Sequence, residues 1–130
     1  MINELLQHTL AASRQLVTLD DATINRILID TASALLTRQA EVLAANVEDL
    51  SRMDPANPKY DRLKLTEERL EGIAGDMKNV ASLPSPLGKL LSETTRPNGM
   101  VIRKMTVPFG VIGVIYEARP NVTFDAFSLC

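Results

Sequence analysis

Apolar residues recur every three or four positions through the first eighty residues, a spacing that predicts amphipathic helices rather than strands. Asp20 precedes the second apolar stripe and can cap a helix there, because its carboxylate can accept free backbone N–H groups. That helix is expected to reach Arg38, and residues 41–50 either continue it or begin another. Core packing is the simplest role for both stripes. Their members are Ile2, Leu5, Leu6, Thr9 and Leu10, then Ile24, Ile27, Leu28, Thr31, Leu35 and Leu36.

Two proline-containing segments interrupt the helical pattern. Residues 54–58 read Asp-Pro-Ala-Asn-Pro, and proline breaks a helix because it lacks an N–H donor and clashes with the preceding turn. A further helix is predicted to begin at Thr66, with Glu67 and Glu68 in its first turn, where the helix dipole favours negative charge. Residues 83–86 end it. Its buried stripe is predicted to be Leu70, Ile73, Ala74, Met77 and Val80.

The pattern changes after residue 88. Residues 89–95 and 100–107 flank the tetrapeptide Arg-Pro-Asn-Gly, and Asn-Gly is a strong turn signal for a β-hairpin. The basic side chains of Arg96, Arg103 and Lys104 are expected to form a solvated face of this hairpin.

An unalternated apolar run rich in β-branched residues follows at 109–116, and it predicts a strand covered on both faces, as in a parallel sheet. Residues 117–120 form a loop, and Asn121 or Thr123 can cap the next helix. A doubly covered strand needs neighbouring strands, and none follows in this sequence. The helix also stops at residues 129–130 without a group that would satisfy its last carbonyls. The chain is therefore expected to be cut within a βαβ unit.

Composition places the 130-residue chain among globular proteins, with 45% hydrophobic and 23% charged residues. The net charge of −2 and the lack of a basic stripe argue against nucleic acid and anionic membranes as partners. The N-terminal residues lack the basic-then-apolar order of a secretory signal, and the apolar run at 111–115 is too short to cross a bilayer. A single cysteine, Cys130, cannot form an internal disulfide. A cytoplasmic location is expected.

The junction between the predicted strand and the last helix is the best candidate for chemistry. Ligands of open α/β sheets bind beyond the carboxyl ends of strands, and a helix N-terminus attracts anions. Arg119 could make a two-pronged hydrogen bond with a carboxylate or phosphate, and the Asn121 amide could donate to a developing oxyanion. Alternatively, Arg119 pairs with Glu117 and Asn121 is an ordinary N-cap. Spacing alone leaves both interpretations open.

Other candidates are weaker. Gly110 and Gly113 lack the Gly-x-Gly-x-x-Gly pattern of a dinucleotide loop, and close backbone packing explains them better. His8 stands alone on an early helix, where a surface or packing role is expected. Cys130 has no neighbouring base or activating charge and is interpreted as a buried structural thiol. No residues show metal-ligand spacing.

Residues 107–123, which include Tyr-Glu-Ala-Arg-Pro-Asn-Val, resemble the signature segment of the gamma-glutamyl phosphate reductases, also called glutamate-5-semialdehyde dehydrogenases. The resemblance extends over essentially the whole chain as the N-terminal part of a longer enzyme. It implies an α/β fold of the aldehyde dehydrogenase type, with N-terminal helices, a β-hairpin, and the first strand and helix start of a doubly wound cofactor domain. The further matching segments are residues 25–28, 44–49, 61–66, 69–74 and 128–130.

The same resemblance implies an organisation and an activity. Residues 1–87 would be the helical part of the cofactor-binding domain, 88–107 an oligomerisation hairpin, and 108–130 the incomplete first βα element of the Rossmann-like domain. The complete enzyme would be a homo-oligomer that uses NADPH to reduce L-glutamyl 5-phosphate to L-glutamate 5-semialdehyde and phosphate, in proline biosynthesis. Its nucleophilic cysteine and most of its cofactor site would lie beyond residue 130. Cys130 is then not the nucleophile, and the piece alone is expected to be inactive.

For the loop, the resemblance implies that Tyr116 and Glu117 are cofactor contacts and that Arg119 and Asn121 are substrate contacts, with Asn121 a candidate oxyanion donor. The superfamily's usual loop has an aromatic–Asn pair, whereas here Arg-Pro precedes Asn121, which favours an anion-binding role for Arg119. Two alternatives stay open. One is a reductase of a different activated acyl group. The other is a non-catalytic interaction module derived from this family, whose hairpin and helices join a partner.

Overall fold

The structure is a computed structural model that describes residues 2–130. Its contacts divide the chain into two compact units. One consists of Met1–Leu19 and Pro84–Ile112, and the other of Asp20–Leu83 and Gly113–Cys130. Within the described residues, none of the helices is long and apolar enough to cross a membrane.

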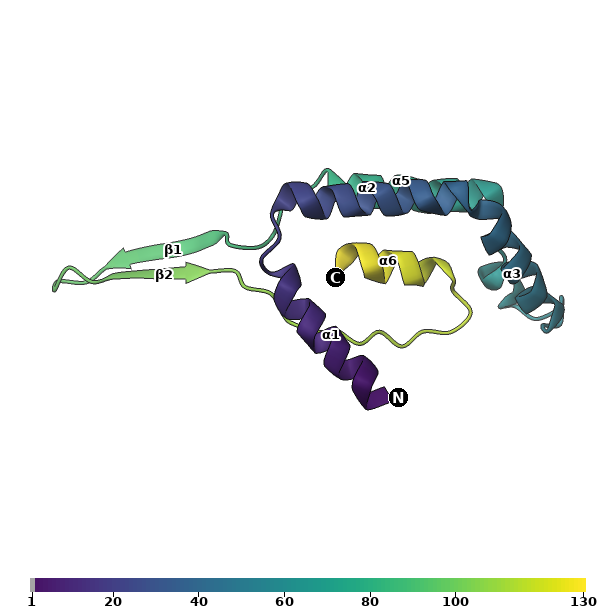
Figure 1. The fold of residues 1–130 in the computed structure, drawn as a ribbon, viewed down its shortest axis with the longest axis horizontal. Helices are drawn as coiled ribbons and strands as arrows, with labels where there is room; N and C mark the ends of the chain where they lie inside the picture. The colour runs from purple at the N-terminus through teal and green to yellow at the C-terminus, as the bar shows by residue number, and fades with distance from the viewer. Residues whose placement is uncertain (1) are drawn as a thin grey trace. The chain divides into compact units, whose positions relative to one another are not determined.

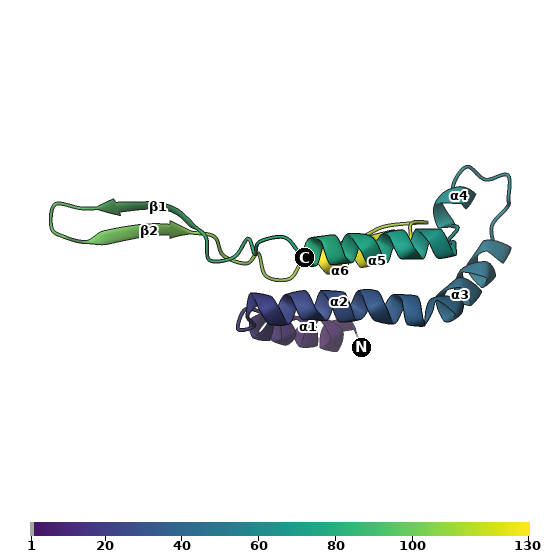
Figure 2. The same ribbon diagram turned by 90° about the horizontal axis from the view of Figure 1, so that it is seen from above.

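The larger unit is helical. Its longest helices, α2 and α5, lie side by side, and α6 packs against α5 (Figures 1 and 2). Its helices are α2 (Asp21–Thr37), α3 (Gln39–Ser51), α4 (Tyr60–Leu63), α5 (Glu67–Ala81) and α6 (Asn121–Leu129). A cluster of buried side chains joins α2 to α5 and confirms much of the predicted stripe on each. The cluster contains Ala32, Leu35, Leu70, Ile73, Ala74 and Met77.

The helix boundaries follow local capping signals. Asp20 caps α2 as predicted, with its Oδ1 accepting from the N–H of Thr23 at 2.8 Å. Thr66 caps α5, also as predicted, and its hydroxyl accepts from the N–H of Arg69 at 3.2 Å. A break at Arg38 separates α2 from α3, so the second of the two sequence-based alternatives is the observed one.

Lowering the pH is expected to weaken the start of α2. Hydrogen bonding from Thr23 lowers the pKa of Asp20 below its usual value. A carboxyl group whose pKa is depressed on folding stabilises the fold above its unfolded-state pKa, and that contribution is lost as the pH falls through its folded-state pKa. Asp20→Asn keeps a cap acceptor but does not titrate. As the pH is lowered from 6 to 3, the denaturation midpoint of the wild type should therefore fall more than that of Asp20→Asn. A difference between the two midpoints that does not change with pH would contradict this role of Asp20.

The smaller unit contains α1 (Ile2–Leu16) and an antiparallel hairpin of β1 (Leu90–Thr95) and β2 (Val101–Met105). The predicted Asn-Gly turn is confirmed, because Gly99 has a positive φ of 82° and its N–H donates to the carbonyl of Arg96 at 2.9 Å. All residues of both strands are exposed. Arg103 therefore lies on a solvated face, where it pairs with Glu93 across the strands at 2.5 Å.

Two sequence-based predictions fail in these parts of the chain. Among its described residues, α1 buries none of its apolar stripe, so core packing is the wrong interpretation of that stripe here. Residues 109–116 do not form the predicted strand. A strand exists only where a neighbour receives its N–H and C=O groups, and no segment within residues 2–130 pairs with this one. Its apolar side chains remain exposed, including Ile115.

Candidate substrate-binding loop

The loop before α6 contains a strained residue. Ala118 has a φ of +50°, and within residues 2–130 it is the one non-glycine residue with a positive φ. The left-handed region costs an L-residue about 1–2 kcal/mol, and such a conformation persists only when neighbouring contacts hold it. The turn at Ala118 separates Glu117 from Arg119, two of the candidate site residues.

Two side-chain contacts hold this loop. The hydroxyl groups of Tyr116 and Thr123 lie 2.5 Å apart and link the start of the loop to the first turn of α6. Lys59 donates from Nζ to Oε2 of Glu117 at 3.0 Å. Lys59 directly precedes α4, so the second contact ties the loop to a distant segment of the same compact unit.

Arg119 is exposed, and its guanidinium has no ion pair or hydrogen bond with another described residue. The alternative pairing with Glu117 is wrong, because Glu117 instead pairs with Lys59. The Arg119 carbonyl accepts from the N–H of Val122 at 3.0 Å, which fixes its backbone against α6. The five N–H donors of the guanidinium are thus available to bind an anion from solvent.

Asn121 and Thr123 do not cap α6, in contrast to the sequence-based expectation. Pro120 is the N-cap residue, and no side chain among residues 2–130 caps the helix. Because the helix begins directly after Pro120, Asn121 occupies the first turn, and its Nδ2 donates to Oδ2 of Asp125 one turn later at 3.3 Å. This contact is long and Asn121 is exposed, so the amide is free to exchange Asp125 for another acceptor.

A buried asparagine positions the segment that carries Lys59. Asn46 of α3 is only 5% exposed, and its amide makes two hydrogen bonds with the backbone at the end of α4 and just after it. Its Nδ2 donates to the Leu63 carbonyl at 2.8 Å, and its Oδ1 accepts from the Leu65 N–H at 2.7 Å. This role of Asn46 was not predicted from the sequence. The only signal for it is a polar residue among the apolar positions of a helix.

Arg69 makes a second set of contacts with the same segment. One of its guanidinium nitrogens donates to the carbonyls of Asp61 and Lys64, each at 2.6 Å. The other contacts both carboxylate oxygens of Asp61, at 3.0 and 3.1 Å. Arg69 and Asn46 therefore fix the backbone of α4 and of the connection that leads to α5.

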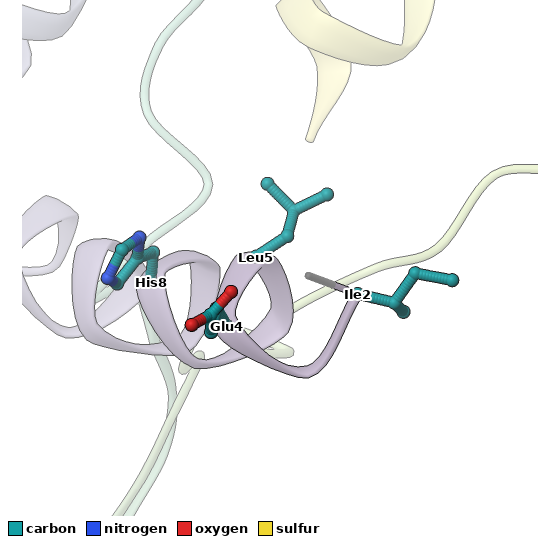
Figure 3. Close-up of a pocket in the computed structure, with 4 residues that line it drawn as sticks. All are labelled: Ile2, Glu4, Leu5 and His8. Atoms are coloured by element: carbon teal, nitrogen blue, oxygen red, sulfur yellow. The ribbon is translucent and has the colours of Figure 1, made fainter.

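The weaker candidates acquire no chemical role. His8 lies on α1 beside Ile2, Glu4 and Leu5 around a shallow hollow (Figure 3). Cys130 is exposed rather than buried, because α6 ends at Leu129 and leaves the thiol outside the core. No group of acidic, histidine or cysteine side chains in the described part of the chain could hold a metal ion.

The glycines before the loop also need a different explanation. Gly110 has a φ of +96°, so its backbone conformation, rather than close packing, explains the absence of a side chain. A Cβ atom on Gly113 would meet nothing within 4 Å, so close packing does not explain that residue either.

The helices, the hairpin and the final loop–helix element have α/β character, as the sequence predicts. No family model matches the chain. It is 71% identical over 129 residues to gamma-glutamyl phosphate reductase of Parabacteroides distasonis, covering 99% of this chain and 31% of that protein. It is 57% identical over 125 residues to the same enzyme of Chlorobaculum parvum, covering 96% of this chain and 30% of that protein.

Two crystal structures of gamma-glutamyl phosphate reductases are similar to the chain. The Thermotoga maritima enzyme is 29% identical to this chain, with a TM-score of 0.89. The match covers 95% of this chain and 30% of the Thermotoga maritima chain. The Saccharomyces cerevisiae enzyme is 27% identical to this chain, with a TM-score of 0.90. That match covers 97% of this chain and 33% of the Saccharomyces cerevisiae chain. The chain thus matches the N-terminal part of the gamma-glutamyl phosphate reductases, and spans under a third of the length of the curated relatives.

Proposed function

We propose that this chain is the N-terminal part of a reductase that converts L-glutamyl 5-phosphate into L-glutamate 5-semialdehyde and phosphate, with NADPH as the reductant, in proline biosynthesis. The observation that carries the proposal is the 71% identity to a gamma-glutamyl phosphate reductase over 99% of the chain. The free guanidinium of Arg119 supports it, because this substrate carries a carboxylate at one end and a phosphate at the other, and a guanidinium binds either group in two-pronged fashion.

In the proposed reaction, a cysteine thiolate beyond residue 130 attacks the acyl phosphate, and phosphate leaves as a thioester forms. The chemistry that NADPH supplies when bound is a hydride for the thioester carbonyl, which yields the aldehyde and frees the thiolate. Arg119 binds an anionic group of the substrate. Asn121 turns its amide from Asp125 and donates to the oxygen on which negative charge develops.

Tyr116 and Glu117 are proposed to face the cofactor. The Glu117 carboxylate is 80% exposed and accepts hydrogen bonds, so it fits a hydroxyl-bearing part of NADPH and would repel the phosphates. The Tyr116 hydroxyl already contacts Thr123 and retains capacity for a further hydrogen bond. Both residues therefore fit the sugar or nicotinamide end of the cofactor better than its phosphate end.

The remaining parts of the proposal concern assembly. Residues 108–130 would supply the first βα element of the cofactor domain, completing the helical residues 1–87, with the run at 109–116 pairing once further strands are present. The hairpin within 88–107 would join subunits of a cytoplasmic homo-oligomer, and the exposure of both its strands supports this. The same exposure also favours the second candidate, a non-catalytic module that binds a partner through its hairpin.

The test of the reductase is turnover by the full-length protein. Purified protein with NADPH should consume NADPH and release phosphate in equal amounts when L-glutamyl 5-phosphate is present. Other acyl phosphates, matched in chain length, should react far more slowly, and residues 1–130 alone should not react. Faster turnover of another acyl phosphate would show that the protein is a reductase of a different activated acyl group. A full-length protein that turns over none of them but binds a partner would favour the interaction module.

A further inference from the structure

We propose that Lys59 is a positioning residue for the loop at 116–121, and that it acts through Glu117. The inference rests on the proposed function, because it concerns how this loop presents Arg119 to the substrate. Lys59 and Glu117 are 58 positions apart in sequence, and their 3.0 Å contact joins two segments of one compact unit.

Lys59 is itself held by the helical unit. Its N–H donates to Oδ1 of Asn57 at 2.9 Å, and its carbonyl accepts from the N–H of Leu63 at 3.1 Å through the single turn of α4. The Leu63 carbonyl is in turn bound by the buried amide of Asn46. A continuous series of hydrogen bonds therefore connects the interior of the unit to the backbone that carries the Lys59 ammonium.

At the other end of the ion pair lies the strained turn. Glu117 directly precedes Ala118, whose left-handed conformation needs support from its surroundings. The Tyr116–Thr123 contact holds the residue before Glu117, and the Arg119–Val122 backbone contact holds the residue after Ala118. Among residues 2–112, Lys59 has the one side chain with a hydrogen bond or ion pair to the loop. Its loss would therefore free the turn to relax and change where Arg119 is presented.

The size of the effect is limited by solvent. The two side chains are 49% and 80% exposed, and exposed ion pairs contribute little to overall stability. Loss of the pair should therefore leave the fold intact and change substrate binding by about two- to fivefold, the factor that corresponds to the upper range for such pairs.

The kinetic test uses the full-length protein with three variants. Lys59→Met removes the cation, and Lys59→Arg keeps it. Arg52→Met removes a more exposed cation, which pairs with Glu48 of α3. The expected result for Lys59→Met is a KM for L-glutamyl 5-phosphate raised about two- to fivefold with kcat little changed. Lys59→Arg and Arg52→Met should behave like the wild type. An unchanged KM in Lys59→Met, or equal defects in Lys59→Met and Lys59→Arg, would overturn the proposal.

A second readout needs no substrate. Hydrogen exchange in a peptide covering residues 113–123 of the full-length protein should be faster in Lys59→Met than in the wild type. In a Glu117→Gln background, Lys59→Met should add nothing further, since the pair is already broken. Unchanged exchange in Lys59→Met would refute the positioning role and leave the reductase assignment standing. Absence of wild-type turnover would refute the assignment whatever the exchange shows.

Discussion

Replacing Arg119 with alanine in the full-length protein is expected to lower kcat/KM for L-glutamyl 5-phosphate by about 10- to 150-fold. Hydrogen bonds to charged groups contribute about 1.5–3 kcal/mol each, and every 1.4 kcal/mol is a factor of ten. Arg119 is exposed, and its guanidinium makes no hydrogen bond or ion pair with residues 2–130, so its removal should cost the fold less than about 0.5 kcal/mol. The loss should therefore appear in substrate binding rather than in stability.

Two further variants make the Arg119 experiment specific. Arg119→Lys keeps the charge but not the planar fork, and an intermediate loss is expected because lysine acts as a point charge. Arg62→Ala removes a second exposed arginine from the same unit and should leave kcat/KM unchanged. If Arg119→Ala had the specificity constant of the wild type, the loop would not be the anion site.

Asn46→Ala is expected to be the most destabilising polar substitution in the helical unit, at about 2–4 kcal/mol. The variant leaves the Leu63 carbonyl and the Leu65 N–H without their partner, and each partly buried group left unsatisfied costs about 1–3 kcal/mol. Chemical denaturation of the full-length protein should show the loss. Hydrogen exchange at residues 63–66 should locate it, because Leu65 loses its acceptor.

The matched control for this experiment is Asn79→Ala. Asn79 lies exposed on α5, where its side chain makes no hydrogen bond with the described residues, and alanine favours a helix more than asparagine does. This control should change stability by less than about 0.5 kcal/mol. Equal stability of Asn46→Ala and Asn79→Ala would show that the Asn46 amide does not hold the junction between α4 and α5.

Local signals predicted most of the helical unit and the hairpin. Apolar spacing predicted the α5 stripe from Leu70 to Met77, and an acceptor side chain just before a helix predicted the caps at Asp20 and Thr66. Asn-Gly likewise predicted the hairpin turn. Each of these features depends on residues within a few positions of one another, which is why sequence alone was sufficient.

Features that depend on distant residues could not be predicted. The hydrogen bonds of Asn46 reach 17 and 19 positions along the chain, and the Lys59–Glu117 pair spans 58. The spacing of apolar residues contains no information about contacts between distant positions. The run at 109–116 has the composition of a strand, but strand formation depends on a partner, and none of residues 2–130 supplies one.

The intact mass of the protein in its native cells tests the central claim most directly. If these residues are the N-terminal part of a reductase, the mass should correspond to a chain about three times as long, as the 31% coverage of the Parabacteroides distasonis enzyme requires. A mass near 14.3 kDa would contradict the account, because the native protein would then lack the catalytic cysteine and most of the cofactor site.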